Sequence, residues 1–437
     1  MQNQWFLLKT KRFLPLFITQ FFGAFNDNAF KNAFLIWFTY DIALKTGQNA
    51  ALMVTIATAL FILPFFLFSA TAGQVADKYE KAALTQKIKL AEIILMAACV
   101  LCFMAQSVYG LLAVLFLTGV QSTFFGPIKY SLLPEFLKNE ELIAGNGLIE
   151  GGTFLSILLG TIFGGLIIRV ENGLWWLASF LLLFSLLGWI SSYYIPKTTV
   201  ADSKIKVGWN LLTETWKIMQ YARREGSVWL AIMGISWFWL VGVVFLTQIP
   251  IYTKVIIQGN EHVVTFFLTL FSVGIGLGSL CCNKLLKGQI NGRLVPYGCI
   301  GMSVAIGLFV SLSFFYQQHV SPTLHPALIL GLREFFKIGF VSLGLSLSLL
   351  FLAVCAGIYI VPLYAILQHR TQTQYLSRVI AATNILNALF MVVASVFTIG
   401  LFALQFNVLQ VFLSIGFLNI PVFFIIQRIV NNRLKNA

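Results

Sequence analysis

Polar and charged residues lie roughly midway along the first long apolar segment of the chain, in the run Asn26-Asp27-Asn28-Ala29-Phe30-Lys31-Asn32. Asp27 and Lys31 are four residues apart, so both would face the same side of a helix. An ionisable group inside a membrane is costly and is usually found facing a bundle interior or a water-filled cavity. The cluster therefore predicts a helix that lines a transport pathway.

We expect Asn26, Asp27, Asn28 and Lys31 to contact a substrate near the middle of the membrane. At a rise of 1.5 Å per residue, Asp27 would lie roughly 20 Å from the inner face and Lys31 one turn further out. The alternative interpretation is that Asp27 and Lys31 form a buried ion pair that only fixes packing.

Two further charged residues are candidates in the next spans. Lys129 follows Pro127 near the inner end of its segment, and its ammonium is a compact charge suited to phosphate; alternatively it extends to the lipid headgroups. Glu150 is a candidate for gating or for an ammonium group, or forms a structural pair with Lys129. For Glu92, beside Lys89, we expect a position at the membrane surface.

The composition is that of a membrane protein. Of 437 residues, 59% are hydrophobic and 10% charged, with mean hydropathy +0.87, whereas soluble domains carry about 25% charged residues. A helical span needs about 20 apolar residues, and period-two barrel alternation is absent. We predict an all-α membrane protein with twelve transmembrane helices, near 13–40, 50–76, 87–107, 109–134, 143–170, 174–195, 227–250, 263–283, 294–316, 338–363, 379–403 and 406–427.

The net charge of +14 is distributed unevenly. If the N-terminus lies inside, most of the 29 Lys and Arg residues fall in the inner loops and tails, as the positive-inside rule requires. We therefore expect both termini in the cytoplasm, contact between the basic loops and anionic membrane lipids, and no nucleic-acid partner. The first apolar segment lacks a cleavage site, which argues against a removable signal peptide.

Two halves are predicted, an N-terminal six-helix bundle over 1–195 and a C-terminal one over 227–437. They are joined by a cytoplasmic linker, 196–226, whose residues 210–224 have the pattern of an amphipathic helix. Pro127 followed by Asn146 in the first half matches Pro362 followed by Asn384 in the second, which predicts a repeated helix break. Two such halves with a site between them are the plan of the major facilitator superfamily.

The segment from Gly73 to Lys81 resembles the cytoplasmic loop signature of that superfamily, with Asp77 as its acid and Lys78 and Lys81 as its basic residues. Glycine allows two helices to approach closely, and the acid can accept hydrogen bonds from a facing helix N-terminus. We expect this segment to act as a cytoplasmic gate. It departs from the signature at Tyr79-Glu80, where the pattern has glycine.

Together with the segments 20–28, 125–130 and 146–150, the chain resembles the lysophospholipid transporter family, in particular the transporter half of bacterial proteins fused to a glycerophospholipid acyltransferase. The resemblance implies flipping of a lysophosphatidylethanolamine-like lipid from the outer to the inner leaflet of the bacterial inner membrane, by alternating access. It also implies reacylation by an acyltransferase, here a separately encoded partner. The resemblance is weaker in the second half, and span seven lacks the basic residue that relatives can carry there.

Other chemistry finds no support in the sequence. The four histidines lack metal-ligand spacing, and the glycines at 274, 276 and 278 lie inside a span with no phosphate-binding lysine after them. We therefore expect no enzyme activity, cofactor or metal, and transport driven by a gradient or by downhill movement of the substrate. Two alternatives stay open: a proton-coupled exporter of a drug, siderophore or other amphipathic metabolite, and a membrane scaffold for an acyltransferase. Headgroup preference, coupling ion, transport direction and oligomeric state are not determined by the sequence.

Overall fold

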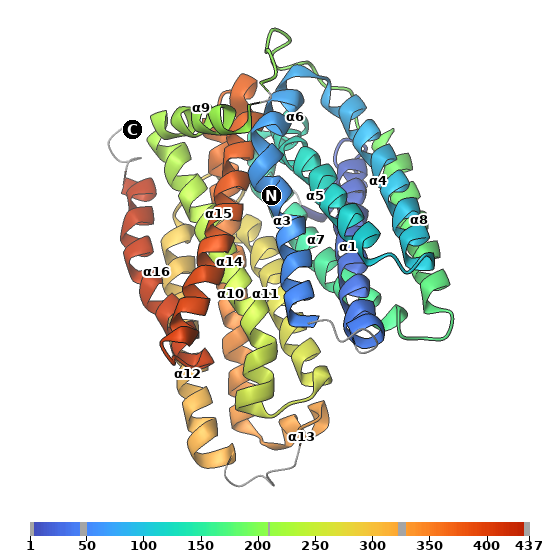
Figure 1. Cartoon of the computed structure of the whole chain (residues 1–437). Coiled ribbons are helices and arrows are strands. Elements are labelled where there is room, and N and C mark those ends of the chain that lie inside the picture. The colour runs from blue at the N-terminus through green and yellow to red at the C-terminus, as the bar shows by residue number, and fades with distance from the viewer. Residues whose placement is uncertain (1–3, 44–49, 209, 322–328, 432–437) are drawn as a thin grey trace. The chain divides into compact units, whose positions relative to one another are not determined.

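Long helices make up the protein. The computed structural model describes residues 4–43, 50–208, 210–321 and 329–431. Within these ranges, twelve helices have 20 residues or more (Figure 1). They are α1 (Leu14–Trp37), α3 (Ala50–Lys78), α4 (Lys81–Met104), α5 (Val108–Ser131), α7 (Asn139–Ile167), α8 (Gly173–Ser192), α10 (Gly226–Tyr252), α11 (Glu261–Leu286), α12 (Leu294–Phe315), α14 (Phe340–Arg370), α15 (Leu376–Ala403) and α16 (Val408–Asn431).

Each predicted span corresponds to one of these helices. Ten of them are long and apolar enough to cross a membrane. The two that fall short in apolar composition are α1 and α4. In α1 the amides and charges from Asn26 to Asn32 lower the hydropathy, and in α4 the lysines and Glu92 do so. The polar content of these two helices thus marks where the protein interior departs from an ordinary apolar core.

Several short helices connect or extend the long ones. They are η1 (Gln4–Lys9), η2 (Phe38–Ile42), α6 (Leu133–Phe136), α9 (Leu211–Arg224), η3 (Thr253–Ile257), η4 (Tyr316–Val320), α13 (Leu332–Lys337) and η6 (Thr373–Tyr375). The linker contains a helix, α9, at the residues where an amphipathic helix is predicted. Its Ile218 and Ala222 are buried, whereas Trp216 and Lys217 on the other face are exposed.

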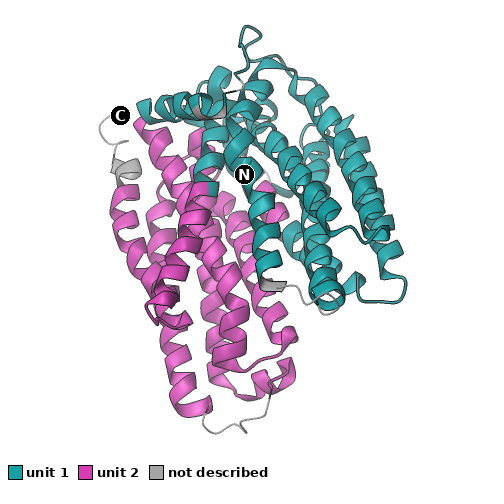
Figure 2. Cartoon of the chain, in the orientation of Figure 1, with its two compact units in different colours: residues 1–145, 155–225, 368–388 teal, residues 146–154, 226–367, 389–437 magenta. Residues whose placement is uncertain are grey.

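Packing divides the described chain into two compact units (Figure 2). Unit 1 comprises residues 1–145, 155–225 and 368–388, and unit 2 comprises residues 146–154, 226–367 and 389–437. The linker therefore packs within unit 1. A short piece of α7 belongs to unit 2, and the end of α14 with the start of α15 belongs to unit 1. The functional division into two bundles and a linker stays a prediction.

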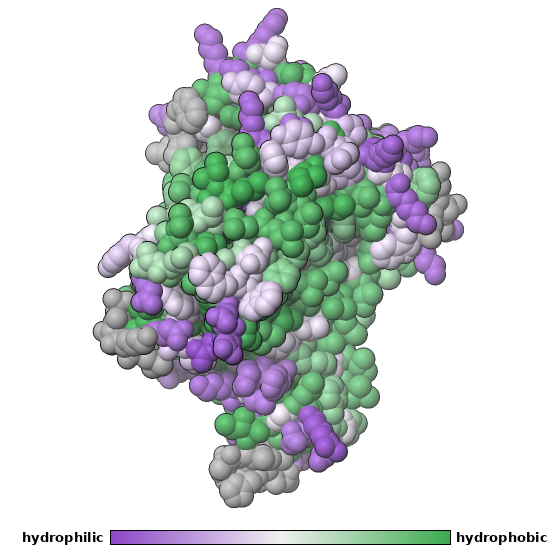
Figure 3. Space-filling view, turned by 90° about the vertical axis from the view of Figure 1, so that its right-hand side faces the viewer, coloured by the Kyte–Doolittle hydropathy of each residue, from purple (hydrophilic) through white to green (hydrophobic). Residues whose placement is uncertain are grey.

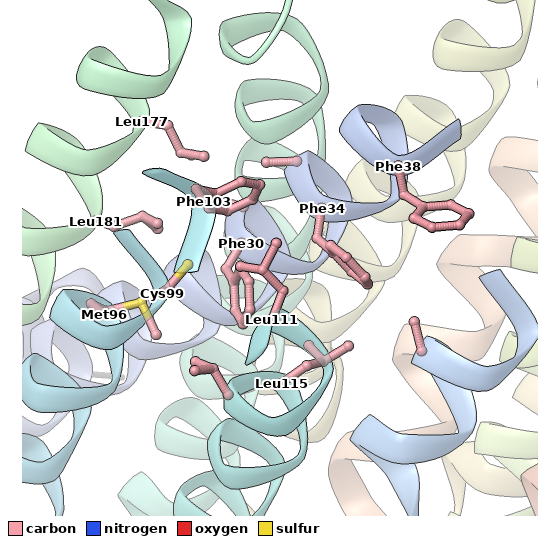
Figure 4. Packing of buried hydrophobic residues seen from close by; sticks show 14 of the residues in the cluster. Phe30, Phe34, Phe38, Met96, Cys99, Phe103, Leu111, Leu115, Leu177 and Leu181 are labelled. Carbon is pink, nitrogen blue, oxygen red and sulfur yellow. The ribbon is translucent and has the colours of Figure 1, made fainter. Parts of the chain in front are cut away.

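In unit 1, α3 packs on α5, while α8 packs on α1 and α4. Aromatic and aliphatic side chains from α1, α4, α5 and α8 fill the space between these helices (Figure 4). The labelled members are Phe30, Phe34, Phe38, Met96, Cys99, Phe103, Leu111, Leu115, Leu177 and Leu181. In unit 2, α16 packs on α10 and α12. Hydrophobic residues also cover outer helix faces, with hydrophilic ones gathered toward the helix ends (Figure 3), as expected where lipid surrounds the protein.

The predicted helix breaks at Pro127 and Pro362 are not present. Both residues lie inside continuous helices, α5 and α14. Membrane helices tolerate proline because neighbouring helices and local adjustments satisfy the backbone groups that the ring leaves without a partner. The prolines therefore do not end their helices, and this part of the repeat prediction is wrong.

Candidate functional site

Asn26 and Asp27 of α1 are both buried in unit 1; Asn26 bonds to α4 and α8, and Asp27 bonds to α5. Asn26 Nδ2 donates to Glu92 Oε1 of α4 at 3.3 Å and to the Leu181 carbonyl of α8 at 3.2 Å. Asp27 Oδ2 accepts a hydrogen bond from Ser122 Oγ of α5 at 2.5 Å. Its Oδ1 is buried and has no hydrogen-bond partner among the described residues. The first helix thus presents one carboxylate oxygen with unused hydrogen-bonding capacity.

Glu92 and Lys89 are interior residues, and the expectation of a surface position for them is wrong. Each is 1% exposed, and Lys89 Nζ lies 2.5 Å from Glu92 Oε2. Gln121 Nε2 of α5 donates to the same Glu92 oxygen at 3.2 Å. Lys89 Nζ also lies 4.7 Å from the centre of the Phe125 ring, a favourable position for a cation. Partners from α1 and α5 therefore satisfy a charge pair that sequence depth alone places at the surface.

We call Asn26, Asp27, Lys89, Glu92, Gln121 and Ser122 the polar network. Sequence reasoning found two of its six members. A signal for the others existed: Gln121-Ser122-Thr123 is a run of three adjacent polar residues in the interior of its span, and Gly23 precedes Asn26 by one turn. A Cβ on Gly23 would overlap with Lys89 Nζ, so glycine makes room for the ammonium.

The ion pair between Asp27 and Lys31, which is the alternative interpretation of the cluster, is not formed. No salt bridge within 4.0 Å joins them in the described part of the chain. Lys31 Nζ instead lies 5.3 Å from the centre of the Phe61 ring of α3. Asn28 Nδ2 donates back to the Ala24 carbonyl of its own helix at 2.8 Å. The predicted stripe is therefore split between α3, α5 and the helix itself, because long side chains follow their local partners rather than their helical spacing.

Lys129 and Glu150 belong to different units. Lys129 is half-buried in unit 1, with its Nζ 4.6 Å from the centre of the Tyr130 ring. Glu150 and Asn146 are fully buried in the α7 segment that packs with unit 2. There Gly147 lies against the Ser279 carbonyl of α11, 2.6 Å from where a Cβ would stand. The proposed pairing of Lys129 with Glu150 and their substrate roles stay predictions.

Asn384, the counterpart of Asn146 in the repeat, lies in the α15 segment that packs with unit 1. Its Nδ2 is 2.9 Å from the place of a Cβ on Gly126 of α5, so a side chain larger than hydrogen at 126 would displace it. Gly126 is the residue before Pro127, and because it has no side chain, α5 and α15 can lie close together at this point. This close approach, rather than a helix break, is the structural feature that accompanies the repeat.

The loop signature contacts the start of α15. Asp77, which is fully buried, accepts from the Ser377 backbone N–H at 3.2 Å and from Arg378 Nε at 2.9 Å. A Cβ on Gly73 would stand 2.7 Å from Ala381 Cβ and 2.9 Å from the Ser377 carbonyl oxygen. These are the contacts that we expect of the glycine and the acid. We call Gly73, Asp77, Ser377 and Arg378 the latch; its gating role stays a prediction.

The basic residues of the signature have separate contacts. Lys81 is buried and forms a salt bridge with Glu135 of α6, which ties the start of α4 to the end of α5. Lys78 lies with its Nζ 5.6 Å from the centre of the Tyr79 ring. Neither contacts Asp77 directly in the described residues, so the carboxylate is matched by Arg378.

The linker is fastened to the same end of α3. Gln74 Oε1 accepts from the Gly208 backbone N–H at 2.7 Å, and Gln74 Nε2 donates to Glu214 of α9 at 2.6 Å. Asp202 lies 3.8 Å from the second nitrogen of Arg378 and donates its backbone N–H to the Asp77 carbonyl at 2.9 Å. The linker therefore contributes a second carboxylate to the latch.

Glu80 caps the first turn of α4. Burial favours a raised pKa for this carboxyl, but hydrogen bonds from the backbone N–H groups of Thr198, Ala83 and Ala82 and from the Thr198 hydroxyl outweigh it. Hydrogen bonds to the charged form stabilise it, and the pKa of Glu80 lies below its ordinary value. Thr198 belongs to the linker, so the cap also attaches the linker to α4.

The sequence profile of the Major Facilitator Superfamily matches residues 16–395. The chain belongs to the Major Facilitator Superfamily. Among curated proteins, it is 26% identical over 375 residues to the lysophospholipid transporter LplT of Escherichia coli O1:K1 / APEC, covering 83% of this chain and 81% of that protein. It is 27% identical over 370 residues to LplT of Klebsiella pneumoniae subsp. pneumoniae, with the same coverage. The resemblance to lysophospholipid transporters is thereby confirmed.

Solved structures of the Major Facilitator Superfamily share the fold. The human organic anion transporter MFSD10 matches with a TM-score of 0.74 at 12% identity, covering 95% of this chain and 99% of that one. The Escherichia coli fucose:proton symporter FucP matches with a TM-score of 0.67 at 11% identity, covering 96% and 99%. The chain therefore has the predicted major facilitator fold and is a multi-pass membrane transporter.

Proposed function

We propose that this protein is a secondary transporter that flips lysophospholipid from the outer to the inner leaflet of the bacterial inner membrane by alternating access. The observation that supports this most is the buried, unpartnered oxygen of Asp27, in a chain whose curated relatives are lysophospholipid transporters. A carboxylate with an unused lone pair suits the ammonium of an ethanolamine headgroup. Lys31 and Lys129 supply the positive charges for its phosphate.

The distribution of charge supports an amphiphilic substrate. The interiors of the spans in the first half contain Asp27, Lys31, Lys89, Glu92, Lys129 and Glu150, whereas the predicted spans from 227 to 427 contain no Asp, Glu, Lys or Arg. A polar solute such as a sugar would call for polar ligands from both halves. A charged first half and an apolar second half instead suit a headgroup with an acyl chain.

In this proposal the latch closes the cytoplasmic end. Asp77, with its contacts to Ser377 and Arg378, connects the first half of the sequence to α15 of the second. Opening toward the cytoplasm would require these contacts to break. Both termini would lie in the cytoplasm, and the delivered lipid would be reacylated by an acyltransferase.

Flipping of labelled lysophosphatidylethanolamine in proteoliposomes tests the proposal. We expect Asp27→Ala and Lys129→Ala to reduce the rate at least tenfold. Asp41→Ala and Lys217→Ala are matched controls, because both residues lie in exposed salt bridges, and they should leave the rate within twofold. Unchanged flipping in both Asp27→Ala and Lys129→Ala would contradict the assigned site.

A second candidate is a proton-coupled exporter of an amphipathic metabolite, favoured by the hydrogen bond of the buried Asp27 carboxyl to Ser122. Transport that depends steeply on a pH gradient and is indifferent to added lysophospholipid would support this candidate over the first.

A further inference from the structure

Ser122 lies between two hydrogen-bond acceptors. Its Oγ is 2.5 Å from Asp27 Oδ2 and 3.2 Å from Gln121 Oε1. A hydroxyl has a single proton to donate. When Asp27 is ionised, both neighbours are acceptors, and Ser122 can satisfy only one of them.

The orientation of Gln121 is fixed by its other contact. Gln121 Nε2 donates to Glu92 Oε2, which also accepts from Lys89. An amide oxygen in that place would face a carboxylate oxygen, so the nitrogen must occupy it and the amide oxygen must face Ser122. A continuous chain of hydrogen bonds therefore runs from Asp27 of α1 through Ser122 and Gln121 of α5 to Glu92 and Lys89 of α4.

This series of hydrogen bonds has two arrangements, which differ in the protonation state of Asp27. With Asp27 ionised, the Ser122 hydroxyl donates to the carboxylate, and Gln121 Oε1 receives no proton from it. With Asp27 protonated, the carboxylic acid donates to Ser122 Oγ, and the Ser122 hydroxyl turns to Gln121 Oε1. The second arrangement satisfies both contacts, and hydrogen bonds in such a series polarise one another.

We propose that Ser122 is a positioning residue that ties the protonation state of Asp27 to the Lys89–Glu92 ion pair. When Asp27 binds a proton, Ser122 becomes the acceptor in its hydrogen bond with Asp27 and donates to Gln121 instead. This strengthens the hydrogen bond from Gln121 to Glu92. The packing of α4 against α1 and α5 thereby changes with pH. This extends the proposed function by giving the carrier a built-in response to pH.

The charges that face Asp27 are consistent with a titrating group. Its own helix contributes Lys31, and α4 contributes Glu92 and Lys89. From α5, α3, α8 and α7, the described neighbours in this region are uncharged: Ser122 and Gln121, Phe61, the Leu181 carbonyl, and Gly160. Glu92 is compensated by Lys89 at 2.5 Å, whereas Asp27 has no ion partner within 4.0 Å in the described residues. Asp27 is therefore the carboxyl of the polar network whose charge is open to change.

The titration of Asp27 can be followed in the full-length protein in lipid nanodiscs, by the infrared band of protonated carboxyl groups as a function of pH. The part of the band lost in Asp27→Asn belongs to Asp27. In Ser122→Ala the carboxylate loses its charge-assisted donor, so its midpoint should rise by about one pH unit. In Gln121→Leu the protonated form loses the second acceptor, so the midpoint should fall.

Two variants control for packing. Ser122→Thr keeps the hydroxyl and should restore the wild-type midpoint. Thr118→Val removes a buried hydroxyl of the same helix that bonds only to the Val114 carbonyl, and it should leave the midpoint unchanged. The proposal would be overturned if Ser122→Ala and Thr118→Val shifted the midpoint of Asp27 equally. It would also be overturned if Ser122→Ala and Gln121→Leu shifted that midpoint in the same direction, or if Asp27 did not titrate.

The infrared measurement needs no substrate, so it separates this inference from the proposed function. If Ser122→Ala and Gln121→Leu shift the Asp27 midpoint in opposite directions but the protein does not flip lysophospholipid, the proposed role of Ser122 is supported and lysophospholipid is rejected as the substrate. If the protein flips lysophospholipid but neither variant shifts the Asp27 midpoint, lysophospholipid is supported as the substrate and the proposed role of Ser122 is rejected.

Discussion

Lys89 of α4 lies directly against Gly23 of α1, so closely that a Cβ on the glycine would overlap with the lysine Nζ. The ammonium also bonds to Glu92 and lies over the Phe125 ring. A buried charge keeps its place only when all its partners are present, and here one of the requirements is the absence of a side chain.

Gly23→Ala should therefore displace Lys89 and destabilise unit 1. Because the end of a lysine side chain can shift, we expect a loss of about 1–3 kcal/mol rather than the full cost of breaking a buried pair. Thermal unfolding of the detergent-solubilised protein gives the measurement. Gly242→Ala is the matched control, since a Cβ at Gly242 in α10 meets no atom within 4 Å; equal effects of the two substitutions would contradict the assigned contact.

The latch should show energetic coupling between Asp77 and Arg378. Asp77 is fully buried and its partner is 18% exposed by side chain, so the pair is screened little by solvent. A double-mutant cycle with Asp77→Asn and Arg378→Gln, followed by denaturation in mixed micelles, should give about 1–3 kcal/mol. The exposed pair Asp41 and Arg169, 3.7 Å apart, should give at most about 1 kcal/mol. A coupling energy no larger than that of the exposed pair would remove the physical basis of the latch.

Glu80 should make stability depend on acid pH. Its pKa is lower in the folded state, because the hydrogen bonds from Thr198, Ala83 and Ala82 outweigh its burial. Its contribution is therefore fully present above the unfolded pKa of about 4.3 and is lost as the pH falls through the folded value. The melting temperature of the wild type should exceed that of Glu80→Gln at pH 7, and the difference should shrink below about pH 4. A difference that stays constant from pH 7 to pH 3 would show that the charge of Glu80 has no role.

The linker should become more accessible to protease when its hydrogen bond to α3 is removed. Glu214→Ala deletes the acceptor of Gln74, and we expect trypsin to cleave at Lys204 or Lys206 several times faster in this variant. Gln220→Ala, an exposed position on the same helix, serves as the control. Equal cleavage rates in both variants would mean that other contacts hold the linker.

The helices of this fold could be predicted from the sequence because their lengths are set by membrane thickness. All twelve expected spans correspond to long helices, including α1 and α4, whose polar residues lower their hydropathy. The continuity of α5 through Pro127 and of α14 through Pro362 was not predictable in this way. Whether proline ends a helix depends on neighbouring helices that satisfy its backbone, and the neighbours are a property of tertiary packing.

The site could be predicted only in part. Asp27 stands in the middle of a span, so its burial follows from its position along the helix. Lys89 and Glu92 lie near the end of their predicted span, where side chains can reach either the surface or the interior. Their direction is decided by Gly23, Asn26 and Gln121 on other helices. For the same reason the alternative of an Asp27–Lys31 ion pair is not realised: helical spacing permits it, and Ser122 and Phe61 provide competing partners.

The carboxamide of Asn26 has one further consequence. It bonds at once to the Glu92 carboxylate of α4 and to the Leu181 carbonyl of α8, on two separate neighbours of its own helix. A turn of α1 about its long axis would break both bonds and remove these partners from the Asn26 carboxamide and the Leu181 carbonyl. Rotation of the first helix about its axis is therefore costly, and in the proposed transport cycle Asp27 would be exposed to a headgroup by displacement of the helices around it.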